Sequence, residues 1–574
     1  MHALLIPRGR SGLLPLAVWM VLQGPWQAAQ AQTRPDSGSL QETPRALPSM
    51  PGPGGPKPIL PTPQPPAGTK AAITIRPTGF LVRGSTVFEG QMLAGLLAKR
   101  VDKPTDLDGL QEAANTIKAY YTERGYLLTD VYIPEQVLRT EGAPVTLVVV
   151  EARIGSVTVR TADPRVSADI AYRIAVKNLP RGAAITEDLL DRPVLLLRDL
   201  SGYEATATVQ PGSAPGESNV VIDVKSSLPP LTASIGADNH GTRAAGTYRA
   251  FVTADLNNVS GRGDALQARA QVTDIKETRL FKLSYELTVG DASRLQLQAS
   301  RSEYGLGAQF AALQARGYAN VWGASILTPL LRTRLRNHYA SLAFERKTLG
   351  DETAIGAPSL RTVHTLRTGL LGNLALGTGG SSLLSFAGNV TWGHVRMDDA
   401  ALAQDQGATG LMTAGRFWKL NVEAQHSAPL GERLSLQTAF QSQWASRNLT
   451  SSEKMSLGGP SSVRGYPAGE ASGDSGAVLS TELRYQLAPS LNVAGEPLQI
   501  SGFYDIGTTR TNQRPLDASS NRVTLDSAGL GLSAGRYGNF QVNAALAWRI
   551  GLPLPASGES DRTPRLWITS QKWF

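Results

Sequence analysis

The tetrapeptide Gly473–Gly476 comes closest to a catalytic motif in this sequence. Its Asp474 and Ser475 match the nucleophile segment of a chymotrypsin-like serine protease, in which a histidine must accept the proton of the serine hydroxyl. The chain has six histidines, and none lies upstream in a matching sequence context. We therefore attribute the match to chance and expect that the protein is not an enzyme.

Other groups that could carry out chemistry are absent from the sequence. The chain has no cysteine, which excludes disulfides, thiolate metal ligands and a cysteine nucleophile. No cluster of carboxylates and histidines suggests a catalytic metal, and no phosphate-binding loop of the type G-x-x-x-x-G-K-[ST] is present. We expect no metal site, no cofactor and no ATP hydrolysis.

The charge pattern argues against a nucleic-acid partner. The net charge is +9, but lysines and arginines are scattered at alternate positions and form no basic run. The tripeptide Arg262-Gly263-Asp264 occurs in integrin ligands, yet here it lies where a tight hairpin turn between two strands is expected. We expect neither nucleic-acid binding nor integrin binding.

The N-terminus indicates export. Residues 1–31 combine basic Arg8 and Arg10, an apolar stretch from Leu13 to Leu22 and an Ala-Gln-Ala cleavage site ending at Ala31, which together predict a cleaved signal peptide. Residues 32–70 are rich in Pro, Gly, Thr and Gln, a composition that predicts an extended linker because it can bury little apolar surface.

Residues 71–152 and 153–228 each predict a small mixed α/β unit. The first unit is expected to contain a strand at Phe80–Gly84, a helix around Met92–Leu97, a helix at Leu107–Arg124 with Gly125 beyond its end, and strands at Leu127–Ile133 and Val145–Glu151. The second is expected to contain a strand at Gly155–Val159, helices around Ala168–Val176 and Glu187–Leu197, and strands at Glu204–Gln210 and Asn219–Val224.

Residues 229–574 alternate apolar and polar side chains, as in Leu266–Thr273 and Phe281–Val289. A soluble β-sandwich shows the same alternation, but these segments of about ten residues have the length of a tilted strand that crosses a bilayer. The chain ends on an alternating strand, Trp567–Phe574, whose Trp573 we expect in an aromatic girdle. These features favour a transmembrane β-barrel.

Several motifs together resemble the outer-membrane transporters of two-partner secretion, the TpsB family of haemolysin and filamentous-haemagglutinin exporters. The resemblance rests on the first-unit motifs Tyr120–Tyr126, Ile133–Gln136 and Val148–Glu151, the second-unit motifs Leu190–Gly202 and Gln210–Gly212, the first barrel strand with Asp238–Gly241, the loop motif Val463, Arg464, Gly465 and Tyr466, and the strand motif Phe503–Gly507. It covers the chain from Ala71 to Phe574.

The resemblance implies a barrel of about sixteen antiparallel strands preceded by two periplasmic POTRA domains. About 345 residues follow Pro229, which suffices for sixteen strands with their turns and loops. It also implies that Arg464 lies in the lumen and pairs with Asp505, with Phe503 and Gly507 in the facing wall and Phe574 as the C-terminal barrel signature. From the residues alone, Arg464 could instead solvate an outer loop, Gly465 could be a turn glycine and Tyr466 a girdle aromatic.

The resemblance further implies an outer-membrane exporter that recognises an unfolded adhesin or cytolysin through its POTRA domains, contacts outer-membrane lipid and is inserted by the barrel assembly machinery. The alternatives are an insertase for outer-membrane proteins, a passive porin and a surface enzyme. One departure concerns the plug helix of related transporters. The only candidate here, around Ser39–Leu47, is short and contains Pro44.

Overall fold

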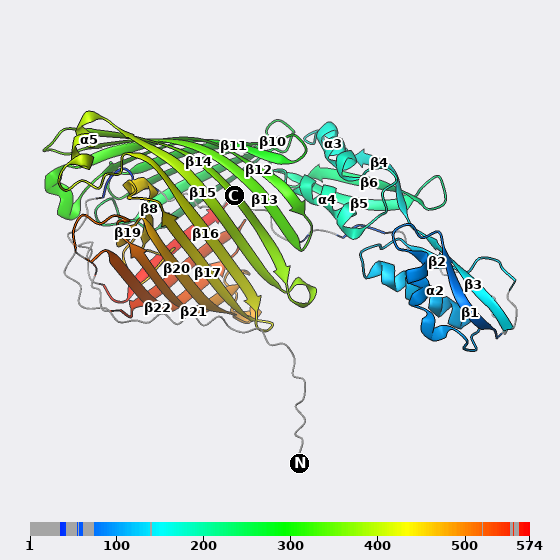
Figure 1. Cartoon of the computed structure of the whole chain (residues 1–574). Helices are drawn as coiled ribbons and strands as arrows, with labels where there is room; N and C mark the ends of the chain where they lie inside the picture. The colour runs from blue at the N-terminus through cyan, green and yellow to red at the C-terminus, as the bar shows by residue number, and fades with distance from the viewer. Residues whose placement is uncertain are drawn as a thin grey trace, which may run out of the picture.

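The computed structural model is a large barrel of tilted strands with two small α/β units attached at one end (Figure 1). The structure describes residues 35–41, 54, 57–60, 74–137, 141–518, 520–551, 555 and 562–574. The predicted signal peptide (1–31), most of the predicted linker and residues 42–47 of the candidate plug helix lie outside the described residues. Within the described part, no helix is long and apolar enough to cross a membrane.

The first α/β unit has a three-stranded sheet of order β1-β3-β2 under its helices. Its elements are β1 (Arg76–Arg83), α1 (Gly90–Gly95), the 3-10 helix η1 (Ala98–Arg100), α2 (Leu107–Thr122), β2 (Asp130–Tyr132) and β3 (Glu141–Val150). Helix α2 begins where the Asp106 carboxylate accepts a hydrogen bond from the Gly109 amide, and it buries one apolar face that includes Ile117 and Tyr121. The strand predicted at Leu127–Ile133 is shorter than expected, because residues 127 and 128 form a turn.

The second unit repeats this plan with sheet order β4-β6-β5. Its elements are β4 (Arg153–Arg160), α3 (Ala168–Asn178), α4 (Glu187–Arg198), β5 (Tyr203–Pro211) and β6 (Glu217–Ser226). Ser167 and Thr186 cap the two helices, whose apolar faces cover the sheet. Ile59 of the linker lies along β5, donating to the Ala207 carbonyl at 2.9 Å and accepting from the Val209 amide at 3.0 Å.

Sixteen antiparallel strands form a barrel that closes between β24 and β7, as expected from the sequence. They are β7 (Leu231–Asp238), β8 (Arg249–Asn257), β9 (Ala265–Thr273), β10 (Arg279–Val289), β11 (Ser293–Gly305), β12 (Arg316–Arg332), β13 (Arg336–Glu352), β14 (Ser359–Leu376), β15 (Ser382–Met397), β16 (Gly415–Pro429), β17 (Leu434–Ala445), β20 (Ser475–Gln486), β21 (Leu498–Arg510), β22 (Arg522–Gly535), β23 (Phe540–Arg549) and β24 (Arg565–Trp573).

The apolar side chains of the alternating pattern face outward, which identifies a barrel and not a sandwich. Val272 and Phe281 are 56% and 54% exposed, whereas polar side chains such as Asn389 and Thr391 are buried toward the lumen. The expectation of about ten residues per strand is wrong for one wall, since β12, β13 and β14 have 17, 17 and 18 residues. These strands continue well beyond the length that a bilayer requires.

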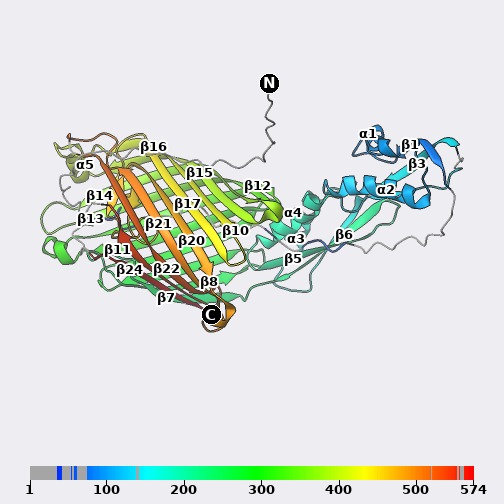
Figure 2. The ribbon, with the colours of Figure 1, turned by 90° about the horizontal axis from the view of Figure 1, so that it is seen from below.

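The second α/β unit docks on barrel turns at the end of the barrel from which the two α/β units extend (Figure 2). The turn at 258–264 is seven residues long and not the tight hairpin predicted around Arg262-Gly263-Asp264. Its Gly263 carbonyl accepts from the Ser201 amide at 3.1 Å, and its Gly261 carbonyl accepts from the Tyr203 hydroxyl at 2.6 Å. Asp264 is 1% exposed, so this tripeptide serves to join the barrel to the second unit.

The turn at 333–335 makes the charged half of the same interface. Arg332 forms a two-pronged ion pair with Asp199 at the end of α4, with Nε–Oδ2 and Nη2–Oδ1 distances of 2.9 and 2.8 Å. Arg334 reaches the Asp191 carboxylate at 2.6 Å and Glu187 at 3.3 Å, both on α4. Because the Arg332 and Asp199 side chains are largely shielded from solvent, each of these two groups depends on the other for its charge partner.

Docking of α4 on the barrel is expected to weaken as the pH rises. Burial, which outweighs the attraction of Arg334, raises the pKa of Asp191 to about 6, and the neighbouring Glu187 and Asp188 act in the same direction. Once undocked and solvated, this carboxyl returns toward its ordinary value of 3.8. Its protonation therefore favours the docked state, a contribution that is fully present below pH 3.8 and lost as the pH rises through about 6.

Spin labels at Tyr172→Cys and Leu430→Cys test this prediction, because both positions are exposed and the chain has no cysteine of its own. The distance distribution between the labels should broaden from pH 5 to pH 7. Asp191→Asn should reduce this dependence, and the remainder is expected from Asp199, whose pKa is also raised by burial at this interface. The same broadening in Asp191→Asn would assign the pH dependence to another group.

Candidate functional site

The loop between β17 and β20 (446–474) folds back into the barrel and carries the predicted loop motif. It contains the 3-10 helix η4 (Ser451–Glu453) and a two-stranded sheet, β18 (Met455–Leu457) paired with β19 (Ala471–Gly473). The sheet holds residues 458–470 between its strands as a closed hairpin, which brings Val463–Tyr466 against the wall formed by β20, β21 and β22.

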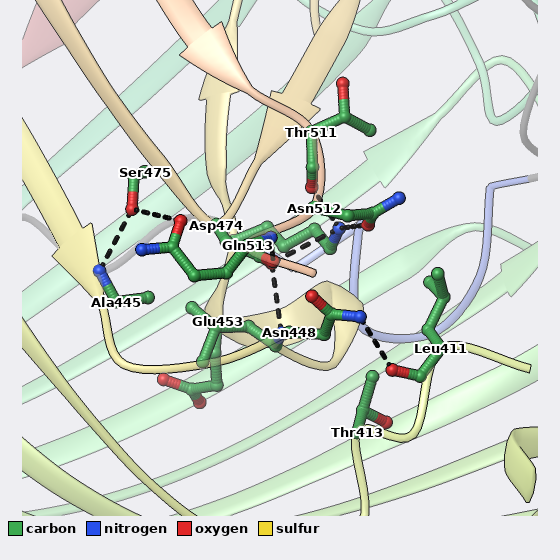
Figure 3. Close-up of polar contacts among 12 residues, drawn as sticks. Leu411, Thr413, Ala445, Asn448, Glu453, Asp474, Ser475, Thr511, Asn512 and Gln513 are labelled. Atoms are coloured by element: carbon green, nitrogen blue, oxygen red, sulfur yellow. Dashed lines mark hydrogen bonds and ion pairs between the residues drawn. The ribbon is translucent and has the colours of Figure 1, made fainter. Parts of the chain in front are cut away.

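Polar contacts anchor the base of this loop to two neighbouring loops (Figure 3). The Asp474 carboxylate, fully shielded from solvent, accepts from the Leu449 amide at 3.0 Å and from the Gln513 amide at 2.7 Å. Asn448 donates to the Leu411 carbonyl at 2.8 Å. Ser475, the serine of the protease-like tetrapeptide, accepts from the Ala445 amide at 3.1 Å. These two residues of the tetrapeptide therefore hold the loop in place.

Arg464 forms a fork-to-fork ion pair with Asp505 of β21. Its Nε and Nη2 atoms each lie 2.8 Å from a different oxygen of the Asp505 carboxylate, and its backbone amide donates to the same carboxylate at 3.1 Å. The side chain of Asp505 is 0% exposed and that of Arg464 is 12% exposed. Such a desolvated, two-pronged pair is strong only while both partners are present.

Residues around this pair complete the environment of the guanidinium. Its Cζ lies 3.3 Å from the ring centroid of Phe503, a cation–π contact, and its Nη1 lies 2.9 Å from Glu482. Ser480 donates to Asp505 at 2.6 Å, and the indole of Trp567 donates to the Arg464 carbonyl at 2.7 Å. Sequence reasoning missed Glu482, Ser480 and Trp567, because only the strand register places them beside the loop tip.

Gly465 is required for space and not for an unusual backbone conformation. It is not among the glycines with positive φ. A Cβ atom at this position would lie 2.6 Å from the Cβ of Ser527 and 3.1 Å from the Arg549 amide nitrogen. Gly507 has a related role, since its Cβ would lie 3.0 Å from a methyl group of Val463. Both glycines allow the loop to lie directly on the wall.

Val463 and Tyr466 are fully buried and pack with Leu457, Val478 and Leu525. Tyr466 is therefore not a girdle aromatic, the alternative that its sequence left open. The arginine between these two residues is held by charge and the flanking side chains by apolar contact, so the loop tip is fixed in two independent ways.

A second ionic cluster, also missed by sequence reasoning, fixes the first half of the loop. Glu453 of η4 lies 2.9 Å from Lys347 of β13 and 2.9 Å from Lys419 of β16, and its side chain is 3% exposed. Nearby, Asp36 of the N-terminal segment lies 2.8 Å from Arg361, and its carboxylate accepts from the Ser451 hydroxyl at 2.8 Å. The described residues 37–40 form a turn, not a helix.

The loop and the N-terminal segment leave an open cavity of about 2380 Å³ inside the barrel. Charged side chains line one side of it, including Glu345 of β13, Arg367 of β14 and Glu423 of β16. Among the described residues, no group of three or more His, Asp or Glu could hold a metal ion. The lumen is a polar, partly obstructed channel.

The motif Asp238–Gly241 and the C-terminal strand lie at the seam where β7 and β24 close the barrel. Asn239, in the Asp238–Gly241 motif, accepts from the Ile568 amide at 2.8 Å and so extends the seam between β7 and β24. Trp573 lies on the same face of β24 as Trp567 and packs against Tyr537 at 5.0 Å, so its expected place in an outer girdle is wrong. The outward terminal aromatic is Phe574, 74% exposed, whose amide donates to the Ala233 carbonyl at 2.8 Å.

Known proteins share both the sequence pattern and the architecture. Residues 216–536 match the family model for the haemolysin secretion/activation protein ShlB/FhaC/HecB, and residues 75–152 match that for the ShlB-type POTRA domain. The chain is 26% identical over 491 residues to the heme/hemopexin transporter protein HuxB of Haemophilus influenzae, covering 84% of each chain. It is 24% identical over 454 residues to the outer membrane transporter CdiB of Escherichia coli, covering 75% of this chain and 72% of that one. The solved structure of CdiB from Escherichia coli has the same fold, with a TM-score of 0.68 at 20% identity over 89% of this chain and 93% of that chain.

Proposed function

Because the chain belongs to the haemolysin secretion/activation protein family ShlB/FhaC/HecB, a family of two-partner secretion transporters of the outer membrane, we propose how its parts divide that work. The two α/β units bind an unfolded exoprotein in the periplasm, and the barrel conducts it outward. The observation that carries this proposal is the loop 446–474, which lies inside the lumen and is held there by the buried ion pair between Arg464 and Asp505.

The proposed domains are a signal peptide (1–31), a Pro-rich linker (32–70), POTRA domain 1 (71–152), POTRA domain 2 (153–228) and the barrel (229–574). An exposed strand edge can bind an extended chain by adding a strand to the sheet. The linker residue Ile59, which already lies along β5, supports this mode of binding because it occupies the edge in an extended conformation.

The proposed role of Val463, Arg464, Gly465 and Tyr466 is to close the lumen at rest, with Phe503, Asp505 and Gly507 as the receiving wall. The loop has to move for a polypeptide to pass, and the ion pair contributes to the free energy of that movement together with the apolar contacts of the loop tip. Folding of the exoprotein outside the cell then removes the exported, unfolded chain from the equilibrium across the membrane, which drives export without ATP.

Two further partners are proposed. The exposed apolar wall contacts outer-membrane lipid, and the C-terminal strand with Phe574 presents the barrel to the assembly machinery that inserts it. The alternative function, an insertase for outer-membrane proteins, would be expected to have more POTRA units than the two described.

Deletion of the gene in its own host separates the two functions. The transporter proposal expects one large exoprotein to disappear from the culture medium, to return with the full chain and not to return with a chain lacking residues 71–228. Loss of several barrel proteins from the outer membrane, with the exoproteins unchanged, would instead establish the insertase.

A further inference from the structure

Four cationic or titratable side chains form a continuous row on the outer face of strands β13 to β16. Arg346 of β13 lies directly opposite His364 of β14, His364 opposite His394 of β15, and His394 opposite Arg416 of β16. Arg396 lies two residues beyond His394 on the same face of β15. We refer to these five residues as the cation row. The alternation places them outward, because their neighbours Glu345, Lys347, Val395 and Phe417 are buried inward.

The cation row lies directly above an outward band of large apolar side chains. Each of the four aligned residues is two positions beyond an exposed apolar residue on its own strand, in the pairs Phe344 and Arg346, Leu366 and His364, Trp392 and His394, and Trp418 and Arg416. Trp322 of β12, 64% exposed, lies directly opposite Arg346, and Trp444 of β17, 57% exposed, packs against Trp418 with 5.9 Å between the ring centroids. Tryptophans on a barrel wall mark the boundary between the hydrocarbon core and the headgroups.

The spacing places each of these cations on the headgroup side of an apolar residue of its own strand. Because the strands are tilted by about 40°, the row runs obliquely to the membrane and its height changes by roughly 3 Å from one strand to the next. Two residues of strand span roughly 6–7 Å, which for a tilt of about 40° is roughly 5 Å along the membrane normal. The headgroup layer on each side of a bilayer is roughly 5–8 Å thick. Strand β13 begins after the turn 333–335 that contacts α4, and along it Phe344 precedes Arg346. The row is therefore on the side of the band away from the POTRA units and faces the outer leaflet.

Within the described part of the chain, the arginines of this row have no carboxylate partner. Ion pairs are recorded for other outward arginines of this wall, Arg301 with Glu303 and Arg316 with Glu352, but not for Arg346, Arg396 or Arg416. The nearby Asp398 is already engaged, since its carboxylate accepts from the Leu360 and Ala401 amides. Like charges on neighbouring strands repel one another, and an external anion would relieve that repulsion.

We propose that the cation row binds the phosphate groups of lipid A, the phosphorylated glycolipid of the outer leaflet. This inference rests on the proposed contact of the barrel wall with lipid. Guanidinium groups match phosphate with two parallel hydrogen bonds, and the histidines supply further N–H donors between the arginines. The tryptophans directly below would lie against the acyl chains of the same lipid, so polar and apolar contacts would come from adjacent positions on each strand.

The experiment uses the full chain in detergent and purified lipid A as the probe. Arg346→Gln, Arg396→Gln and Arg416→Gln are combined in one variant. A control with the same change of charge combines Arg76→Gln, Arg83→Gln and Arg433→Gln, exposed positions far from the row. Binding is followed by tryptophan fluorescence. Loss of three cations at an anionic surface is expected to weaken binding at least about tenfold, with little change in the control.

Two further measurements separate charge recognition from general damage. Dephosphorylated lipid A should bind the native chain no better than the Gln variant, and three Arg→Lys replacements should keep most of the binding. Equal affinity of the native chain and the Gln variant, or equal binding of dephosphorylated lipid A, would overturn the proposal. If the native chain binds lipid A in this way but restores no exoprotein to the medium of the deletion strain, the transporter proposal fails and the lipid site stands.

Discussion

Replacing Arg464 with alanine is expected to release the lumenal loop and change the conductance of the barrel. The substitution leaves the Asp505 carboxylate, whose side chain is 0% exposed, without its guanidinium partner. Breaking a buried ion pair costs about 3–5 kcal/mol, which shifts an equilibrium between docked and released loop by roughly a hundredfold to a few thousandfold. In planar bilayers, the channel openings should be larger or gate more often than those of the native protein.

Asp505→Ala should have a similar effect, and the double variant Arg464→Ala/Asp505→Ala should not be additive, because each change removes the same interaction. Arg484→Ala is the matched control. Arg484 is 36% exposed and pairs with the other oxygen of Glu482, so its loss should leave the openings unchanged. Openings that are indifferent to both Arg464→Ala and Asp505→Ala, in correctly folded protein, would remove this ion pair from the gating mechanism.

Replacing Arg332 with alanine is expected to loosen POTRA domain 2 from the barrel. The Arg332 and Asp199 side chains are 3% and 9% exposed, and their paired hydrogen bonds connect α4 to the turn between β12 and β13. Loss of the guanidinium should destabilise the docked arrangement by about 3–5 kcal/mol, because an unpaired carboxylate remains in the interface. The distance between spin labels at positions 172 and 430 should then become broadly distributed.

Lys177→Ala is the control in the same interface. Its ion pair with Asp291 also joins the second POTRA domain to a barrel turn, but the two side chains are 62% and 52% exposed. Exposed pairs contribute about 0–1 kcal/mol, so this variant should keep the native distance distribution. A narrow distribution in Arg332→Ala would mean that the contacts of the 258–264 turn are sufficient to hold the domain.

The architecture was predictable wherever a local pattern recurs. Alternation in Leu266–Thr273 and Phe281–Val289 predicted strands because the side-chain period of a strand is two. The apolar spacing in Leu107–Arg124 predicted α2 because one helical face must cover a sheet. The end of the Leu127–Ile133 strand, the length of β14 and the place of Trp573 were misjudged, because each depends on what the segment packs against.

The candidate site was only partly predictable. Arg464 and Asp505 were paired by resemblance, 41 residues apart in sequence, whereas Glu453, Lys347 and Lys419 were not considered. A charged residue on an alternating strand reveals which face it occupies but not its height in the barrel. Two inward charges meet only if the register and the course of the loop bring them to the same height.

The sequence by itself determined the succession of two α/β units and a strand-rich barrel, since helical and strand periodicities are local properties of the chain. The number of sixteen strands was implied by the resemblance to the family and is confirmed by the structure. Only the tertiary structure decided which polar residues meet in the lumen, why Gly465 must lack a side chain, and which outward cations line up across β13–β16. The reason is physical. Closing the sheet into a barrel sets one register for all sixteen strands, and contacts between distant residues exist only once that register is set.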